Sequence, residues 1–156
     1  MFRKMRRFRQ EISEEECREI LKTEMRGVLA VKGEDGYPYA LPMDFLYDAG
    51  KLYFHSARQG HKIDALKADD RVSFCVYDKG FRKEGDWALN IRSVILFGRI
   101  RLMEDTEEVI PILRKFGLKY YPTEESVEKE IAKDGSRVQM LELTIDHMTG
   151  KLVNES

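Results

Sequence analysis

The chain alternates β-prone runs with turn signals, and this pattern most constrains what it can fold into. Glu34-Asp35-Gly36 and Asp48-Ala49-Gly50 are turn sequences that each separate two runs rich in β-branched and aromatic residues. Strands joined by such short turns pair in antiparallel fashion. The predicted strands are Gly27–Val31, Tyr37–Tyr47, Lys51–Ser56, Arg71–Tyr77, Trp87–Met103 and Val138–Ile145.

Helical patterns occur only at the connections between these strands. Ser13 and Glu16 form a capping box, in which each residue satisfies a backbone donor of the other. The predicted helices are Glu14–Thr23, Gly60–Lys67, Val109–Phe116 and Glu124–Ala132. We therefore expect a mainly β protein with flanking short helices, in which residues 1–156 form one domain built on a small six-stranded antiparallel barrel. Such a barrel fills its lumen with side chains, so a cofactor must bind outside, and a dimer interface is the natural place to bury it.

Two strands carry residues that disturb regular pairing. Pro38 and Pro42 each remove a backbone donor from the second strand, which predicts an edge or bulged strand. Gly98 is expected to bend the long fifth strand, and Trp87 at its start is expected in the core or in an interface. Tyr120 and Tyr121 either cover a pocket or form a helix–helix corner. The glutamates from Glu124 to Glu130 are expected on a solvated helix face.

Charge and cysteine usage limit the classes of partner and compartment. The net charge of −1 argues against a whole-protein nucleic-acid footprint, and no apolar run reaches the length of a membrane span. Residues 1–10 form a basic arm, expected to be solvated or to embrace a partner subunit. Cys17 and Cys75 lie far apart without metal-ligand spacing, so we expect reduced thiols, a cytoplasmic location and no bound metal.

The segment from Lys51 to Lys67 predicts an anion site. A strand ends in Ser56, and Gly60 then leads into a helix that opens with His61 and Lys62. Free backbone N–H groups and the positive end of the helix dipole point at one spot, where Ser56 can donate a hydrogen bond and Arg58, His61 and Lys62 add charge. We interpret this cradle as the seat of a cofactor phosphate; the alternative is an ordinary strand–helix turn.

Four stretches, in this order, resemble the flavin-binding split barrels of the pyridoxamine 5′-phosphate oxidase-like superfamily, and among them most closely the nitroimidazole-resistance (Nim) proteins. The resemblance runs from Glu11 to about Lys151. The stretches are 35–43 (DGYPYALPM), 53–57 (YFHSA), 60–66 (GHKIDAL) and 92–101 (RSVILFGRIR). It implies a Greek-key split barrel that binds two flavins across a homodimer interface.

The resemblance also implies residue roles. The strand from Tyr39 to Asp44 would run along the isoalloxazine ring, the end of the next strand would lie beside the ribityl chain and phosphate, and a basic pair would hold the phosphate. Ser93 would reach the flavin from the second subunit. The implied cofactor-binding residues are Leu41, Pro42, Met43, Asp44, His55, Ser56, Ala57, His61, Lys62 and Ser93.

The implied activity is that of an oxidoreductase binding FMN, with FAD as the alternative, that reduces a small molecule such as a nitroaromatic or 5-nitroimidazole. No residue is assigned as catalytic, and His55 is expected to contact the flavin more than to transfer protons. True pyridoxamine phosphate oxidases carry a tryptophan and an Arg-Leu-His signature near the C-terminus, where this chain has Ile145-Asp146-His147-Met148, so vitamin B6 oxidation is not expected. The competing hypotheses are a non-catalytic flavin or haem carrier or sensor, and nucleic-acid binding through the basic arm.

Overall fold

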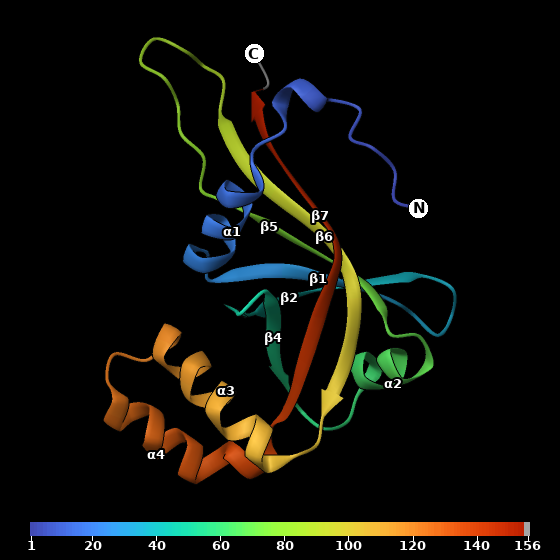
Figure 1. Ribbon diagram of the computed structural model, residues 1–156, viewed down its shortest axis with the longest axis vertical. Coiled ribbons are helices and arrows are strands. Elements are labelled where there is room, and N and C mark those ends of the chain that lie inside the picture. Colours follow the sequence, from blue (N-terminus) through green and yellow to red (C-terminus); the bar gives the residue numbers. More distant parts are fainter. Residues whose placement is uncertain (155–156) are drawn as a thin grey trace.

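One antiparallel sheet of seven strands organises the structure, a computed structural model that describes residues 1–154 (Figure 1). The order across the sheet is β2-β1-β5-β6-β7-β4-β3, which leaves β2 and β3 as its two edges. The sheet curls around an apolar core, so the mainly β split-barrel prediction is confirmed, whereas the strand count of six is wrong. The strands are β1 Arg26–Lys32, β2 Pro38–Asp44, β3 Leu46–Asp48, β4 Lys51–Ser56, β5 Arg71–Tyr77, β6 Asn90–Met103 and β7 Gln139–Asn154.

The extra strand arises because the predicted run Tyr37–Tyr47 is divided at Phe45. β2 pairs with β1, whereas β3 pairs with β4 at the far edge of the sheet. The backbone N–H of Phe45 donates to the hydroxyl of Tyr120 at 2.9 Å instead of to a neighbouring strand. The two edge strands, β2 and β3, are therefore joined directly at Phe45. The position of β2 at an edge confirms the prediction made from Pro38 and Pro42.

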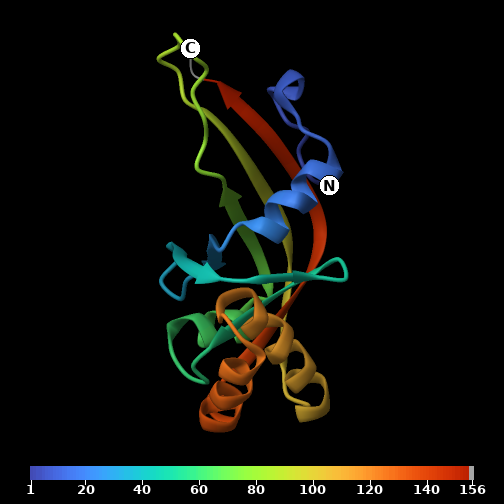
Figure 2. The same cartoon turned by 90° about the vertical axis from the view of Figure 1, so that its left-hand side faces the viewer.

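β6 and β7 form a long ribbon that extends well beyond the rest of the sheet (Figures 1 and 2). Their pairing runs from Asn90 with Asn154 to Met103 with Met140, so the last strand continues past the predicted end at Ile145. The register shifts between Phe97 and Gly98, as expected for a bend there. A Cβ atom on Gly98 would lie 2.2 Å from the carbonyl oxygen of Thr144, so only glycine fits.

Trp87 lies outside the strands and 71% of it is exposed, which contradicts the expectation of a core position in this chain. It belongs to the loop between β5 and β6, which projects with the end of the ribbon (Figure 1).

The helices lie at connections, as predicted, and cover different parts of the sheet. Ser13 and Glu16 form the capping box of α1. α3 and α4 form a hairpin beside β4, opposite α2 (Figure 1), and α3 is longer at both ends than the predicted Val109–Phe116. No helix of residues 1–154 is long and apolar enough to span a bilayer. The helices are α1 Glu14–Thr23, α2 His61–Ala68, α3 Thr106–Tyr120 and α4 Glu124–Asp134, with 3-10 turns η1 Phe8–Gln10 and η2 Gly135–Arg137.

One aromatic residue of the basic arm, Phe2, stacks against the sheet. The ring of Phe2 stacks on His147 with a centroid distance of 4.8 Å and on Phe97 at 5.3 Å. These two residues belong to β7 and β6 and lie on the side of the sheet away from the core. Val28, Ile95 and Phe97, which we call the outer face, are 37, 41 and 39% exposed on that side.

Candidate functional site

The predicted cradle lies at the connection between β4 and α2. Gly60 adopts φ +132°, a conformation that strains other residues, and the chain enters α2 there without a side-chain cap. The first N–H groups of α2 therefore remain available to a ligand. Lys62 in the first turn is half-buried, and burial lowers the pKa of its ammonium group.

Lys62 lies between α2 and β2. Its Nζ atom is 3.7 Å from Sδ of Met43, and no carboxylate among residues 1–154 lies within 4.0 Å of it. A half-buried cation without an anionic partner is costly, and a bound anion would remove that cost. Next to it, the ring of His61 stacks on Tyr39 with centroids 4.3 Å apart. The basic pair of α2 thus lies against the strand predicted to follow the flavin ring.

β2 offers backbone groups as well as side chains at this point. Because β2 is an edge strand, its outer hydrogen-bonding positions have no neighbouring strand in the sheet. Met43 is buried, Leu41 is partly buried against the core, and Pro42 is exposed. The carboxylate of Asp44 accepts a hydrogen bond from Nε of Arg26 at 2.8 Å. The structure therefore places Leu41 to Asp44 beside the cradle along an open edge.

The residues at the end of β4 differ in burial and in their hydrogen-bond partners. Ser56 is buried, and its hydroxyl donates to the carbonyl of Ala57 at 2.8 Å, whereas Ala57 itself is exposed. Nη2 of Arg58 donates to the carbonyl of Ser136 at 2.8 Å, which connects this loop to η2. The role of Arg58 as a phosphate-binding charge stays a prediction.

His55 points to the opposite side of β4, toward α3. Its ring meets the edge of Phe116 with centroids 5.0 Å apart. Desolvation by the surrounding protein lowers the pKa of His55; the charge of Asp44 opposes this shift and that of Lys62 adds to it. His55 is therefore neutral near neutral pH, with one ring nitrogen able to donate and the other able to accept a hydrogen bond.

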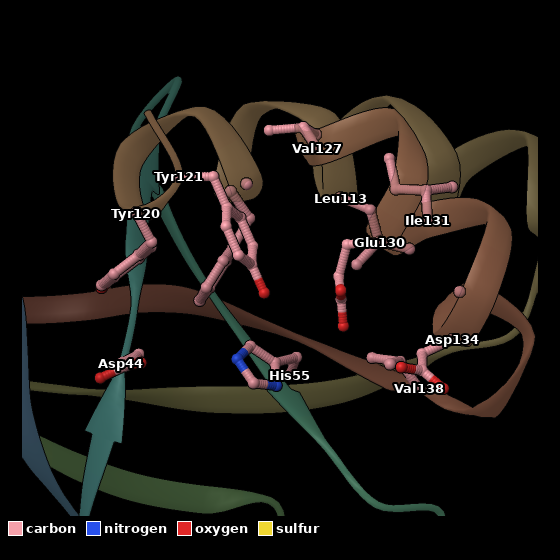
Figure 3. A pocket seen from close by; sticks show the side chains of 13 residues that line it. Asp44, His55, Leu113, Tyr120, Tyr121, Val127, Glu130, Ile131, Asp134 and Val138 are labelled. Atoms are coloured by element: carbon pink, nitrogen blue, oxygen red, sulfur yellow. The ribbon is translucent and has the colours of Figure 1, made fainter. Parts of the chain in front are cut away.

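A pocket of about 180 Å³ opens above His55, between β4 and the α3–α4 hairpin (Figure 3). Figure 3 shows Tyr121 and Glu130 pointing into it from above and His55 from below. Asp44 lies at one end of the pocket, next in the chain to Met43, which contacts Lys62 of the cradle. The pocket is lined by Asp44, His55, Leu113, Phe116, Gly117, Tyr120, Tyr121, Val127, Glu130, Ile131, Asp134, Gly135 and Val138.

The contribution of α4 to this pocket differs from the sequence prediction, which places Glu130 on a solvated helix face. The helical spacing contained a signal, because Val127, Glu130, Ile131 and Asp134 recur three or four residues apart and so share one face. Both interpretations of Tyr120 and Tyr121 are confirmed: they lie at the corner between α3 and α4, and both line the pocket.

The end of α3 fixes the corner that carries Asp44. The hydroxyl of Tyr120 accepts from the N–H of Phe45 and lies 2.6 Å from the carbonyl oxygen of Met25. Nζ of Lys119 donates to the carbonyl of Phe45 at 2.7 Å and lies 3.8 Å from the centroid of its ring. Burial raises the pKa of Tyr120 to about 12. Burial lowers the pKa of Lys119 to about 8, and the nearby charge of Asp44 opposes this shift.

Ser93 is not brought to the cradle of its own chain. It pairs with Tyr77 and Lys151, far along β6 from Met103, whereas the end of β4 pairs near Met140. The prediction for Ser93 concerned a second subunit, and its role stays a prediction.

Comparison with known proteins identifies the family. A sequence model described as pyridoxamine 5′-phosphate oxidase matches residues 13–152. The chain belongs to this family. No curated protein matches it.

Solved structures share the fold. A protein from Bacteroides thetaiotaomicron described with 5-nitroimidazole antibiotic resistance is 22% identical, with a TM-score of 0.77, over 92% of this chain and 87% of that one. An FAD-binding protein from Mesorhizobium loti is 23% identical, with a TM-score of 0.67, over 92% and 97%. The flavocytochrome Anf3 from Azotobacter vinelandii is 22% identical, with a TM-score of 0.79, over 96% and 72%.

Proposed function

We propose that this protein is a homodimeric flavin-dependent oxidoreductase that binds FMN, with FAD as the alternative, and reduces a small molecule. One observation carries the proposal: the half-buried Lys62 has no anionic partner in residues 1–154 and lies at the uncapped start of α2, beside the open edge of β2. These groups fit a flavin phosphate and the polar edge of its ring. Family membership and the flavin-binding proteins among the similar folds support the same cofactor.

Each part of the site would have its own task in this function. His61, Lys62, Ser56 and Ala57 would bind the phosphate end, and residues Leu41–Asp44 would orient the ring. The flavin supplies the electron-transfer chemistry when bound, and the protein sets its orientation and its access to solvent. His55 would contact the flavin side facing the pocket, where a neutral imidazole can donate or accept one hydrogen bond.

Binding of FMN tests the role of Lys62 directly. Titration of flavin-free protein with FMN, followed by flavin fluorescence, should show saturable binding. Lys62→Ala should weaken it by about 1.5–3 kcal/mol, the range for hydrogen bonds to charged groups. Lys67→Ala is the matched control, because Lys67 is exposed in the last turn of the same helix. This variant should bind FMN like the wild type. Equal affinities of wild type and Lys62→Ala would contradict the cradle.

Activity separates an enzyme from a carrier. FMN-loaded protein is reduced with dithionite without oxygen and then mixed with a 5-nitroimidazole. Return of the visible flavin absorption, with loss of the nitro chromophore, is expected for a nitroreductase. An inert reduced protein would indicate a non-catalytic flavin carrier instead.

We also propose that residues 1–156 act as one domain, and that two copies associate through the outer face. The arrangement of all seven strands in one sheet supports a single domain. The exposed apolar side chains of Val28, Ile95 and Phe97 support association through the outer face. A second subunit placed there would bring Ser93 to its partner's flavin. The free thiols of Cys17 and Cys75 support a reducing compartment, and we propose the cytoplasm.

A further inference from the structure

The pocket under the α3–α4 hairpin has the size of a single ring. Its volume of about 180 Å³ compares with the roughly 150 Å³ of an engineered apolar cavity that accepts benzene. Aliphatic and aromatic side chains form most of its wall, with Leu113, Phe116, Val127 and Ile131 contributed by the two helices. The pocket therefore fits a planar, largely apolar group.

Three polar groups converge on this space. Tyr121 and Glu130 reach in from the hairpin and His55 from β4 (Figure 3). Within residues 1–154, none of their side chains makes a hydrogen bond or an ion pair with another residue. An apolar pocket with a few convergent, unsatisfied polar groups is the usual form of a small-molecule site.

The charge of the lining selects among planar ligands. Asp44 and Asp134 are paired with Arg26 and Arg137, at 2.8 and 3.7 Å, whereas Glu130 is not paired. No lysine or arginine of residues 1–154 lines the pocket. An anionic ligand would face uncompensated carboxylates, and a cationic one would pair with Glu130 in a setting partly shielded from water.

We propose that this pocket binds a single planar ring carrying a positively charged nitrogen group, with Glu130 pairing with the cation and Phe116 and Tyr121 packing against the ring. As the substrate pocket, it rests on the proposed flavin function, because His55 and Asp44 line it and also belong to the proposed flavin site. As a binding site, the pocket is argued from its lining residues alone and does not depend on the flavin function.

Three probes of nearly the same shape test the charge preference. Benzamidine is cationic, benzamide is neutral and benzoate is anionic. Isothermal titration of the full-length protein should show benzamidine binding about 10–100-fold more tightly than benzamide, as expected for a charge-assisted hydrogen bond, and no binding of benzoate. Equal affinities for the three probes, or no binding of benzamidine, would overturn the proposal.

Variants on α4 locate the probe. Glu130→Gln should reduce benzamidine affinity to that of benzamide, while circular dichroism and the unfolding midpoint stay unchanged. Glu125→Gln is the matched control, because Glu125 lies on the exposed face of α4 in an ion pair with Lys129. It should bind benzamidine like the wild type. If Glu130→Gln bound benzamidine as tightly as the wild type, the probe would bind elsewhere, and the assignment of Glu130 to the cation would be wrong.

The FMN titration keeps the two proposals distinguishable. Glu130→Gln should bind FMN normally, since Glu130 lies outside the cradle. FMN binding without benzamidine binding would remove the pocket proposal alone. Benzamidine binding lost in Glu130→Gln, in a protein that does not bind FMN, would keep the pocket and remove the flavin function.

Discussion

At the scale of single residues, the protein shifts the pKa of two ionisable groups, one beside β2 and one on β4. Burial lowers the pKa of both Lys62 and His55, by making the charged form less favourable. Lys62 lies next to Met43, and His55 lies against Phe116. Such groups are common at binding and catalytic sites, because a ligand can restore the interactions that the fold withholds.

The lowered pKa of His55 predicts how stability changes with pH. Below pH 6.5, the usual pKa of histidine, the unfolded chain binds a proton at this position more tightly than the folded chain does. Stability should therefore fall as the pH drops from 6.5 through the lower folded-state pKa. Urea unfolding near neutral pH and near pH 5 should show a larger loss for the wild type than for His55→Asn. A loss in His55→Asn equal to that of the wild type would contradict the assignment.

At the scale of elements, the division between β2 and β3 depends on a helix distant in sequence. Phe45 and Tyr120 are 75 residues apart, yet the hydroxyl of Tyr120 takes the backbone bond that a continuous strand would make. Nothing between Tyr37 and Tyr47 encodes this partner, so the run was predicted as one strand. The β4–α2 cradle could be predicted because its strand, glycine and helix start are contiguous in the chain. The pocket required knowing where the α3–α4 hairpin packs, which local pattern does not give.

Removing the Tyr120 hydroxyl should destabilise this corner. Tyr120→Phe leaves the buried N–H of Phe45 without its acceptor, which costs about 1–3 kcal/mol of unfolding free energy, measured by urea denaturation. Tyr121→Phe is the matched control, since the hydroxyl of Tyr121 bonds to no residue in 1–154, and it should stay within about 0.5 kcal/mol of the wild type. Equal stabilities of the two variants would show that the contact contributes nothing measurable.

At the scale of the whole molecule, the long β6–β7 ribbon presents apolar side chains to solvent. Ile95 and Phe97 lie on its outer face, aligned across β5 with Val28 of β1. The ring of Phe2 already rests on Phe97 and His147 at one end of this surface. Association of two chains would bury the rest, and the basic arm would then lie at the margin of the interface.

A charged residue in the outer face should therefore prevent dimer formation. Ile95→Glu places a carboxylate in the proposed interface, and it should sediment as a monomer where the wild type sediments as a dimer. Leu118→Glu is the control, because Leu118 is comparably exposed, at 50%, on α3 and away from the outer face. A wild-type monomer that binds FMN normally would rule out a shared flavin site.

The edge position of β2 has a consequence for solubility. A strand whose outer backbone groups must stay accessible cannot be covered by a helix or paired within the sheet, so it is open to strand addition from another molecule. Pro38 and Pro42 lack the N–H that such addition needs, and they stand at two points along this strand. The same two residues can thus leave the edge free for a small ligand while discouraging its growth into fibrils.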